Sequence, residues 1–306
     1  MKKLLFILLS FYSIIVCAQQ YNNEWIDYNK TYYKFKVGTT GLYRISQSQL
    51  AAINLANTNV SQFQLWRNGK EIPIYVSNQS GTLPAGGYIE FWGEMNDGKA
   101  DLDLYRKPEF QISDVKSLFT DTASYFLTVN PSSTNKRLVP TSNSIPGGAI
   151  PEPYFVYKTG EYFTEQIHFG TPFGSGADAV YPASYEDGEG WASNDIANGG
   201  TRNFSLNNLF VYTGAGAPDI MVKMNAVGNA FNARKIQLTL NGEMIFDNQM
   251  NSYAYQKLSK TLNVSKIAGS TANFIITNTS TSANDRMRVA FVEMSYPRVF
   301  NFGGAK

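Results

Sequence analysis

The chain has 306 residues, of which 26 are Lys or Arg and 24 are Asp or Glu, and its formal net charge at pH 7 is +2. The charges are scattered and form no basic block, so nothing in the composition supports electrostatic attraction to nucleic acid or to an anionic membrane. A chain of this length can bury a substantial core, and two domains are the natural expectation.

The first 18 residues are typical of a cleavable export signal. Lys2 and Lys3 form a short positive region, residues 4–16 are mostly apolar, and Ala18 offers a small residue at the cleavage position. We therefore expect cleavage after Ala18. The apolar run is short for a transmembrane helix, and no later stretch predicts a membrane span. A lipoprotein signal with an acylated Cys17 is the alternative, although Val16 fits poorly before such a cysteine.

Cys17 is the only cysteine in the sequence. Cleavage after Ala18 would leave a mature chain without a thiol. That chain could hold no thiol nucleophile, no disulfide and no thiolate metal site. The export signal predicts a location in the periplasm or at the cell surface and outer membrane.

Residues 19–140 are predicted to form a β-rich domain, because aromatic and β-branched residues alternate there between turn residues. Its one helical candidate covers 46–54, where Ser46 could act as the N-terminal cap. Asn68-Gly69 predicts a tight hairpin, and Pro73 predicts an edge strand or a bulge. The predicted strands lie on either side of residues 29–30 and then at 42–45, 63–67, 72–76, 88–93 and 125–129.

Residues 141–202 are rich in Gly, Pro and aromatic side chains and predict a connecting region with some strands of its own. Residues 203–300 predict a jelly-roll-like β-sandwich, and Asn241-Gly242 marks a hairpin within it. Residues 301–306 are expected to begin a linker or to mark a truncation. The predicted class is therefore all-β, with an N-terminal β-rich domain followed by the sandwich. The predicted sandwich strands are 204–211, 219–226, 235–240, 244–246, 253–262, 272–278 and 289–296.

The best metal candidate is the segment NDGKADLD at residues 96–103. Its carboxylates, Asp97, Asp101 and Asp103, alternate with a glycine that permits a sharp turn, and hard oxygen ligands of this kind suit calcium. The pattern lacks the closing Glu of an EF-hand loop. A solvated turn in which Asp97 binds its own backbone is the alternative. No other cofactor is expected.

Other candidate residues favour structural roles. His168 is the only histidine, so it has neither a cysteine partner nor a second histidine for zinc. The carboxylates of Glu186, Asp187 and Glu189 would support hydrolysis only if two of them faced each other across a cleft. An aromatic cluster could stack on sugar rings or fill a core. Its members are Tyr154, Phe155, Tyr157, Tyr162 and Phe163.

Several stretches, in the right order, resemble one family. The segment at 21–46 is similar to the mature start of the sortases of the type IX secretion system (PorU-like proteins). The aromatic and Asp-rich segment 88–105 and the strand 117–129 resemble the segments that follow in that family. The motif GEGW at 188–191 and the stretch VAFVEMSYPRVF at 289–300 resemble its later landmarks.

In that family, such β-rich regions precede a gingipain-like cysteine-peptidase domain that removes a C-terminal signal from exported cargo. The resemblance implies that this chain is the non-catalytic N-terminal region of such a protein, or a homologue that stops short of the catalytic domain, so no catalytic residue is carried over and no activity is expected from it. The implied partners are type IX secretion components, the cargo's C-terminal signal domain and, if the chain is a fragment, its own downstream catalytic domain. A cell-surface carbohydrate-binding sandwich is the alternative function, and a carboxylate hydrolase is a third hypothesis.

Overall fold

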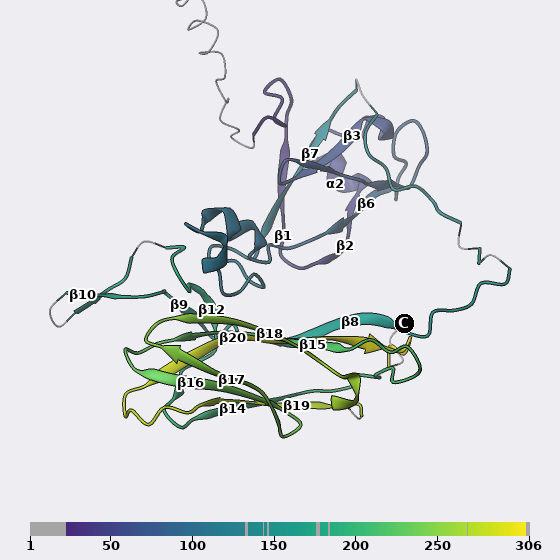
Figure 1. Ribbon diagram of the computed structural model, residues 1–306. Helices are drawn as coiled ribbons and strands as arrows, with labels where there is room; N and C mark the ends of the chain where they lie inside the picture. Colours follow the sequence, from purple (N-terminus) through teal and green to yellow (C-terminus); the bar gives the residue numbers. More distant parts are fainter. Residues whose placement is uncertain are drawn as a thin grey trace, which may run out of the picture. The chain divides into compact units, whose positions relative to one another are not determined.

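The computed structural model describes residues 23–131, 134–142, 144–145, 147–175, 178–182, 184–267 and 269–303. The predicted export signal, with Cys17 and Ala18, lies outside these residues. Within them, antiparallel strands predominate and the helices are short (Figure 1), which confirms the predicted all-β class. No helix in this part of the chain is long and apolar enough to cross a membrane.

The chain divides into two compact units. Unit 1 runs up to Met95 and resumes at Thr122–Ser142, whereas unit 2 comprises Asn96–Asp121 and the residues from 143 onward. Residues 96–121 therefore belong to unit 2, although they lie within the range 19–140 that the sequence predicts as one domain.

Unit 1 consists of two small sheets with an apolar core. One sheet has the strand order β1-β7-β3-β4 and the other has the order β2-β6-β5. Leu65, Phe91 and Tyr125 are among the side chains buried in the core. The elements are β1 (Tyr33–Val37), β2 (Gly41–Ser46), α2 (Gln47–Ala52), η1 (Val60–Gln62), β3 (Phe63–Arg67), β4 (Lys70–Ile72), β5 (Tyr75–Val76), β6 (Tyr88–Gly93) and β7 (Ala123–Val129).

Two local structures that the sequence predicts in unit 1, a helix cap and a tight hairpin, are present. Ser46 caps α2, because its hydroxyl accepts the Gln49 N–H at 3.3 Å while the Gln49 side chain accepts the Ser46 N–H at 2.8 Å. Asn68 and Gly69 have φ values of +47° and +71° and join β3 to β4 in a tight hairpin.

Three predicted strands differ from the structure, and one of them, predicted at 117–129, begins only at Ala123 as β7. The chain before residues 29–30 forms no strand, because the Asp27 carboxylate accepts the Asn29 N–H at 3.0 Å and the Asp27 carbonyl accepts the Lys30 N–H at 3.0 Å, which closes a turn. The predicted strand 72–76 divides at Pro73 into β4 and β5, which lie in different sheets. Proline has no N–H to continue a ladder.

Unit 2 contains a two-sheet sandwich, seen in the lower part of Figure 1. One sheet has the order β13-β20-β15-β18, with β8 also paired to β20, and the other has the order β14-β19-β16-β17. The elements are η2 (Lys99–Leu104), η3 (Pro108–Phe110), β8 (Phe155–Tyr162), β9 (Gln166–His168), β10 (Phe173–Ser175), β11 (Asp178–Val180), β12 (Gly190–Ala192), β13 (Ile196–Ala197), β14 (Thr201–Leu206), β15 (Ile220–Gly228), β16 (Ala233–Leu240), β17 (Glu243–Asn251), β18 (Tyr255–Leu262), η4 (Val264–Lys266), β19 (Ala272–Asn278) and β20 (Arg286–Arg298).

Alternation along the strands fills the sandwich core. Ile236, Leu238 and Leu240 on β16 are buried between the sheets, as their spacing predicts. The predicted strand 204–211 ends earlier, at Leu206, because Asn208 and Phe210 adopt φ values of +56° and +47° that a strand cannot contain. The hairpin at Asn241-Gly242 joins β16 to β17 as predicted.

The segment Asn96–Asp121 packs on the outer face of the sheet that contains β15 and β20. Ile112 is fully buried there against Val227 and Ala290, and its carbonyl accepts the Asn225 side-chain N–H at 2.8 Å. Asp101 holds the segment together internally. Its carboxylate accepts the Ser117 hydroxyl at 2.9 Å and the Leu118 N–H at 2.7 Å.

A buried ion pair closes one end of the sandwich. The side chains of Arg234 and Asp285 are both 0% exposed, and the guanidinium donates to both carboxylate oxygens. Asn278 donates to the same carboxylate at 2.9 Å, and the carbonyl of Ser252 accepts from Arg234 at 2.6 Å. Burial opposes ionisation of Asp285, but the hydrogen bonds from Arg234 and Asn278 outweigh it and lower the pKa of Asp285.

We expect Asp285→Asn to lower the free energy of unfolding by about 3–5 kcal/mol, because Arg234 would become a buried charge without its counter-ion. Urea unfolding followed by circular dichroism measures the loss. Asp247→Asn is the matched control: it removes the exposed partner of Lys235 on the neighbouring strand and should change stability little. Equal stabilities of the two variants would contradict the structural role of the buried pair.

Asp101→Asn should destabilise the segment Asn96–Asp121 by about 1–3 kcal/mol, because an amide cannot accept both the Ser117 hydroxyl and the Leu118 N–H as the carboxylate does. Amide hydrogen exchange at Leu118 should become faster. Asp103→Asn, at an exposed position two residues away, should leave this exchange unchanged. If the Leu118 amide still exchanges slowly in Asp101→Asn, the structural role assigned to the Asp101 carboxylate would be refuted.

Candidate binding site on the sandwich

The predicted calcium ligands lie close in sequence but are not gathered around one point. Asp97 accepts the Lys99 N–H at 3.2 Å and forms an ion pair with the Lys99 ammonium group. Asp101 is buried and bonded within its segment, and Asp103 is exposed. Among the described residues, no group of three or more His, Cys, Asp or Glu side chains is placed to hold a metal ion. The structure thus contains the alternative that the sequence offered, a turn in which the Asp97 carboxylate accepts a backbone N–H. Calcium binding stays a prediction.

The carboxylates of the GEGW region bind their own loop. Glu189 is buried and accepts the N–H groups of Tyr185 and Glu186, the latter at 3.0 Å. Burial raises the pKa of Glu189. Glu186 forms an ion pair with Arg106, and burial, together with the charge of Glu186, raises the pKa of Asp187. These contacts use Glu186 and Glu189 to shape the loop that precedes β12.

His168 lies in the interior of unit 2. Its side chain is buried, its ring stands 6.4 Å from the ring of Tyr253, and neither ring nitrogen has a hydrogen-bond partner among the described residues. Burial, assisted by the charge of Arg288, lowers the pKa of His168 to about 3. The ring is therefore neutral at ordinary pH and packs as an apolar group.

Three segments singled out in the sequence contact one another within unit 2. Tyr105 donates its hydroxyl to the Glu189 carbonyl at 3.1 Å, and Trp191 donates its indole N–H to the Ser117 carbonyl at 3.0 Å. The Lys116 ammonium group lies 4.3 Å from the centre of the Trp191 ring. Tyr105, Ser117 and the GEGW motif at 188–191 are thus joined by hydrogen bonds that span 84 and 74 residues of chain.

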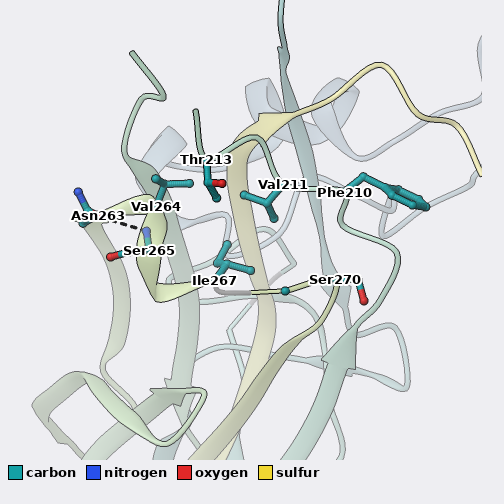
Figure 2. Close-up of a pocket in the computed structure, with 9 residues that line it drawn as sticks. Phe210, Val211, Thr213, Asn263, Val264, Ser265, Ile267 and Ser270 are labelled. Atoms are coloured by element: carbon teal, nitrogen blue, oxygen red, sulfur yellow. Dashed lines mark hydrogen bonds between the residues drawn. The ribbon is translucent and has the colours of Figure 1, made fainter. Parts of the chain in front are cut away.

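A pocket of about 660 Å³ opens at one end of the sandwich (Figure 2). Val211, Val264 and Ile267 supply apolar surface, and none of the described residues that line the pocket has a charged side chain. Asn263 Oδ1 accepts the Ser265 N–H at 3.0 Å, the bond dashed in Figure 2. Hydroxyl and amide groups beside an apolar wall suit an uncharged ligand that carries hydroxyl groups. The remaining lining residues are Phe210, Thr213, Gly269 and Ser270.

Next to this pocket lies an aromatic patch, which we define as Phe155, Tyr157, Phe210, Arg298, Phe300 and Phe302. The ring of Phe155 lies 5.1 Å from that of Phe300 and 5.8 Å from that of Phe302, and these last two side chains are 56% and 60% exposed. The Arg298 guanidinium lies 4.9 Å from the Tyr157 ring and 5.0 Å from the Phe210 ring. Phe210 also lines the pocket, so the patch and the pocket share this residue.

The sequence identified only part of this patch. Of the aromatic residues singled out, Phe155 and Tyr157 belong to it, whereas Phe163 is buried in the sandwich core and Tyr162 donates its hydroxyl to Glu293 at 2.6 Å. Tyr154 stacks on Tyr212 with the ring centres 5.1 Å apart.

The other members of the patch were missed because distant segments supply them. Phe210 follows β14, and Arg298, Phe300 and Phe302 come at and after the end of β20. The alternating aromatic residues of VFNF at 299–302 were the only signal in the sequence that could have indicated them.

No protein-family model matches this sequence, and no curated protein matches it either. Several solved structures are similar to it in fold. The crystal structure of dimeric latent PorU from Porphyromonas gingivalis is similar over 90% of this chain and 25% of that chain, at 13% identity and a TM-score of 0.48. This chain thus spans about a quarter of the length of that structure.

Carbohydrate-binding modules are similar over part of the chain. The family 36 domain of a multidomain xylanase from the hindgut metagenome of Trinervitermes trinervoides covers 49% of this chain and 99% of its own, at 12% identity and a TM-score of 0.28. A family 36 module in complex with calcium and xylotriose covers 45% of this chain and 98% of its own, at 11% identity and a TM-score of 0.27. The chain is therefore similar in structure to part of a PorU protein and, over about half of its length, to carbohydrate-binding modules.

Proposed function

We propose that this chain is the exported, non-catalytic accessory region of a PorU-like sortase of the type IX secretion system. It acts as a scaffold at the periplasmic or outer face of the outer membrane, where it supports processing of the cargo's C-terminal signal. Its partners are that signal domain, other type IX components and a gingipain-like catalytic domain.

The contacts among the family-like segments carry this proposal. The Asp-rich segment near residue 101, the segment that begins at residue 117 and the GEGW loop resemble the family separately in sequence, yet hydrogen bonds at Tyr105, Ser117 and Trp191 join them. Residues that hold one another in place are the kind that a shared fold would retain together. This coupling favours a resemblance of the whole region over chance similarity of short aromatic pieces.

The chemistry of the chain fits a scaffold. Cleavage after Ala18 would remove the only thiol, and His168 is a buried, neutral ring that cannot serve a nucleophile. Thiol-dependent peptide cleavage would therefore need a cysteine from another domain or another protein.

A second candidate function, favoured by the aromatic patch, is binding of a cell-surface carbohydrate. Exposed Phe300 and Phe302 offer flat apolar surface to sugar rings, and the adjoining pocket offers hydroxyl and amide groups to sugar hydroxyls. A scaffold at the cell surface could carry such a site, so the two functions are compatible.

For the scaffold role, we expect the purified mature chain to bind a purified type IX cargo C-terminal signal domain with a micromolar dissociation constant, measured by isothermal titration calorimetry. The same cargo with its signal domain removed is the matched control and should give no heat. No saturable binding, or thiol-dependent peptide cleavage by the pure chain, would refute the proposal.

For the carbohydrate role, titration with xylopentaose, cellopentaose and bacterial surface polysaccharide should give saturable heat with at least one of them. Phe300→Ala and Phe302→Ala should each weaken that binding by about two- to tenfold, because each removes stacking surface. Phe119→Ala is the matched control, since Phe119 is also exposed in unit 2 but lies outside the patch. Equal losses of binding affinity in all three variants would contradict the assignment of carbohydrate binding to the aromatic patch.

Each carbohydrate titration is run in calcium and again in a chelator, since calcium at Asp97, Asp101 and Asp103 is the cofactor that the sequence predicts. Asp103→Asn, which leaves the structural bonds of Asp101 in place, should weaken any calcium-dependent signal.

A further inference from the structure

The first two strands of unit 1 each have an unpaired edge. β1 and β2 follow one another in the chain, but they lie at the ends of different sheets. Within the described residues, β1 pairs only with β7 and β2 pairs only with β6. A strand edge without a neighbour presents backbone N–H and C=O groups that another extended chain can bind.

An apolar groove separates these two strands. It has a volume of about 560 Å³ and is lined by Phe35 of β1, Tyr43 and Ile45 of β2, and Phe91 and Leu127 behind them. The other lining residues are Tyr32, Tyr33, Lys34, Arg44, Gln49 and Ile53. The groove therefore combines an unpaired edge with space for apolar side chains.

The charge beside the groove lies on β1. Lys34 and Lys36 are exposed and alternate with Phe35 along β1, and among the described residues neither forms an ion pair. The Lys34 ammonium group lies 6.0 Å from the centre of the Phe126 ring. Arg44 on β2 differs, because its guanidinium binds the Glu90 carboxylate at 2.8 Å and stacks 3.7 Å from the centre of the Tyr88 ring. An incoming strand would therefore meet uncompensated positive charge at β1.

We propose that the free edge of β1 binds an extended peptide strand whose residues alternate between aliphatic and acidic. Side chains alternate across a strand, so a partner paired with β1 would direct its aliphatic residues toward Phe35 and the groove and its carboxylates toward Lys34 and Lys36. A second copy of the chain is disfavoured at this edge, because pairing β1 with β1 would bring the lysines of both copies together.

The test uses a defined probe, the capped heptapeptide acetyl-EVEVEVE-amide, and the isotope-labelled mature chain. Addition of the peptide should cause saturable NMR shifts at the amides of Tyr33–Val37. Lys34→Glu should weaken binding at least about fivefold, as expected for loss and reversal of one close charge pair. Lys70→Glu is the matched control, because Lys70 is exposed on β4, at the opposite end of the same sheet.

Modified peptides test the pairing mode without altering the protein. A strand donates alternate N–H groups to one neighbour, so methylation of every second amide should abolish binding in one frame and spare it in the other. The lysine analogue acetyl-KVKVKVK-amide should not bind. Shifts confined to other residues, equal binding of both methylated peptides, or dimerisation through β1 detected by sedimentation would overturn the proposal.

Discussion

The ion pair of Arg234 with Asp285 is the interaction on which the geometry of unit 2 depends. Arg234 lies on β16, Asp285 lies directly before β20, and Asn278 at the end of β19 donates to the same carboxylate. The pair thus joins the two sheets of the sandwich at one end. Gly228, at the end of β15, is required beside it, since a Cβ atom there would meet Arg234 at 2.1 Å and the Ser252 carbonyl at 1.8 Å. The charge pair, its hydrogen bonds and the lack of space beside Gly228 together fix the positions of β15, β16 and β20 at this end of the sandwich.

The surfaces of unit 2 follow from that arrangement. The sheet that contains β15 and β20 has one face in the sandwich core, and part of its other face is covered by Ile112 and its neighbours. At the end of β20 the chain continues into Phe300 and Phe302, which meet Phe155 at the start of β8. The aromatic patch is therefore a consequence of strand register, since β8 and β20 pair with Phe155 opposite Arg298.

Short-range signals in the sequence predict individual turns, caps and most strands. They do not predict which distant strands pair with one another. Asn68-Gly69, Asn241-Gly242 and the cap at Ser46 act within a few residues, so the sequence predicts them well. The division of 72–76 between two sheets depends on partners elsewhere in the chain. Burial of Asp101 depends on Ser117 and Leu118, which no local pattern indicates. The aromatic patch is assembled from distant segments in the same way. The sequence therefore indicated only some of its residues.

The segment Asn96–Asp121 interrupts unit 1 in the chain but belongs to unit 2, and its two ends are held together by the bond from the Asn96 N–H to the Asp121 carbonyl at 2.8 Å. The break it leaves in unit 1 is therefore narrow enough for a short linker from Met95 to Thr122. During synthesis this segment emerges well before β15 and β20, on which Ile112 packs. Ile112, the residue of this segment that is buried against them, therefore stays uncovered until those strands have been made.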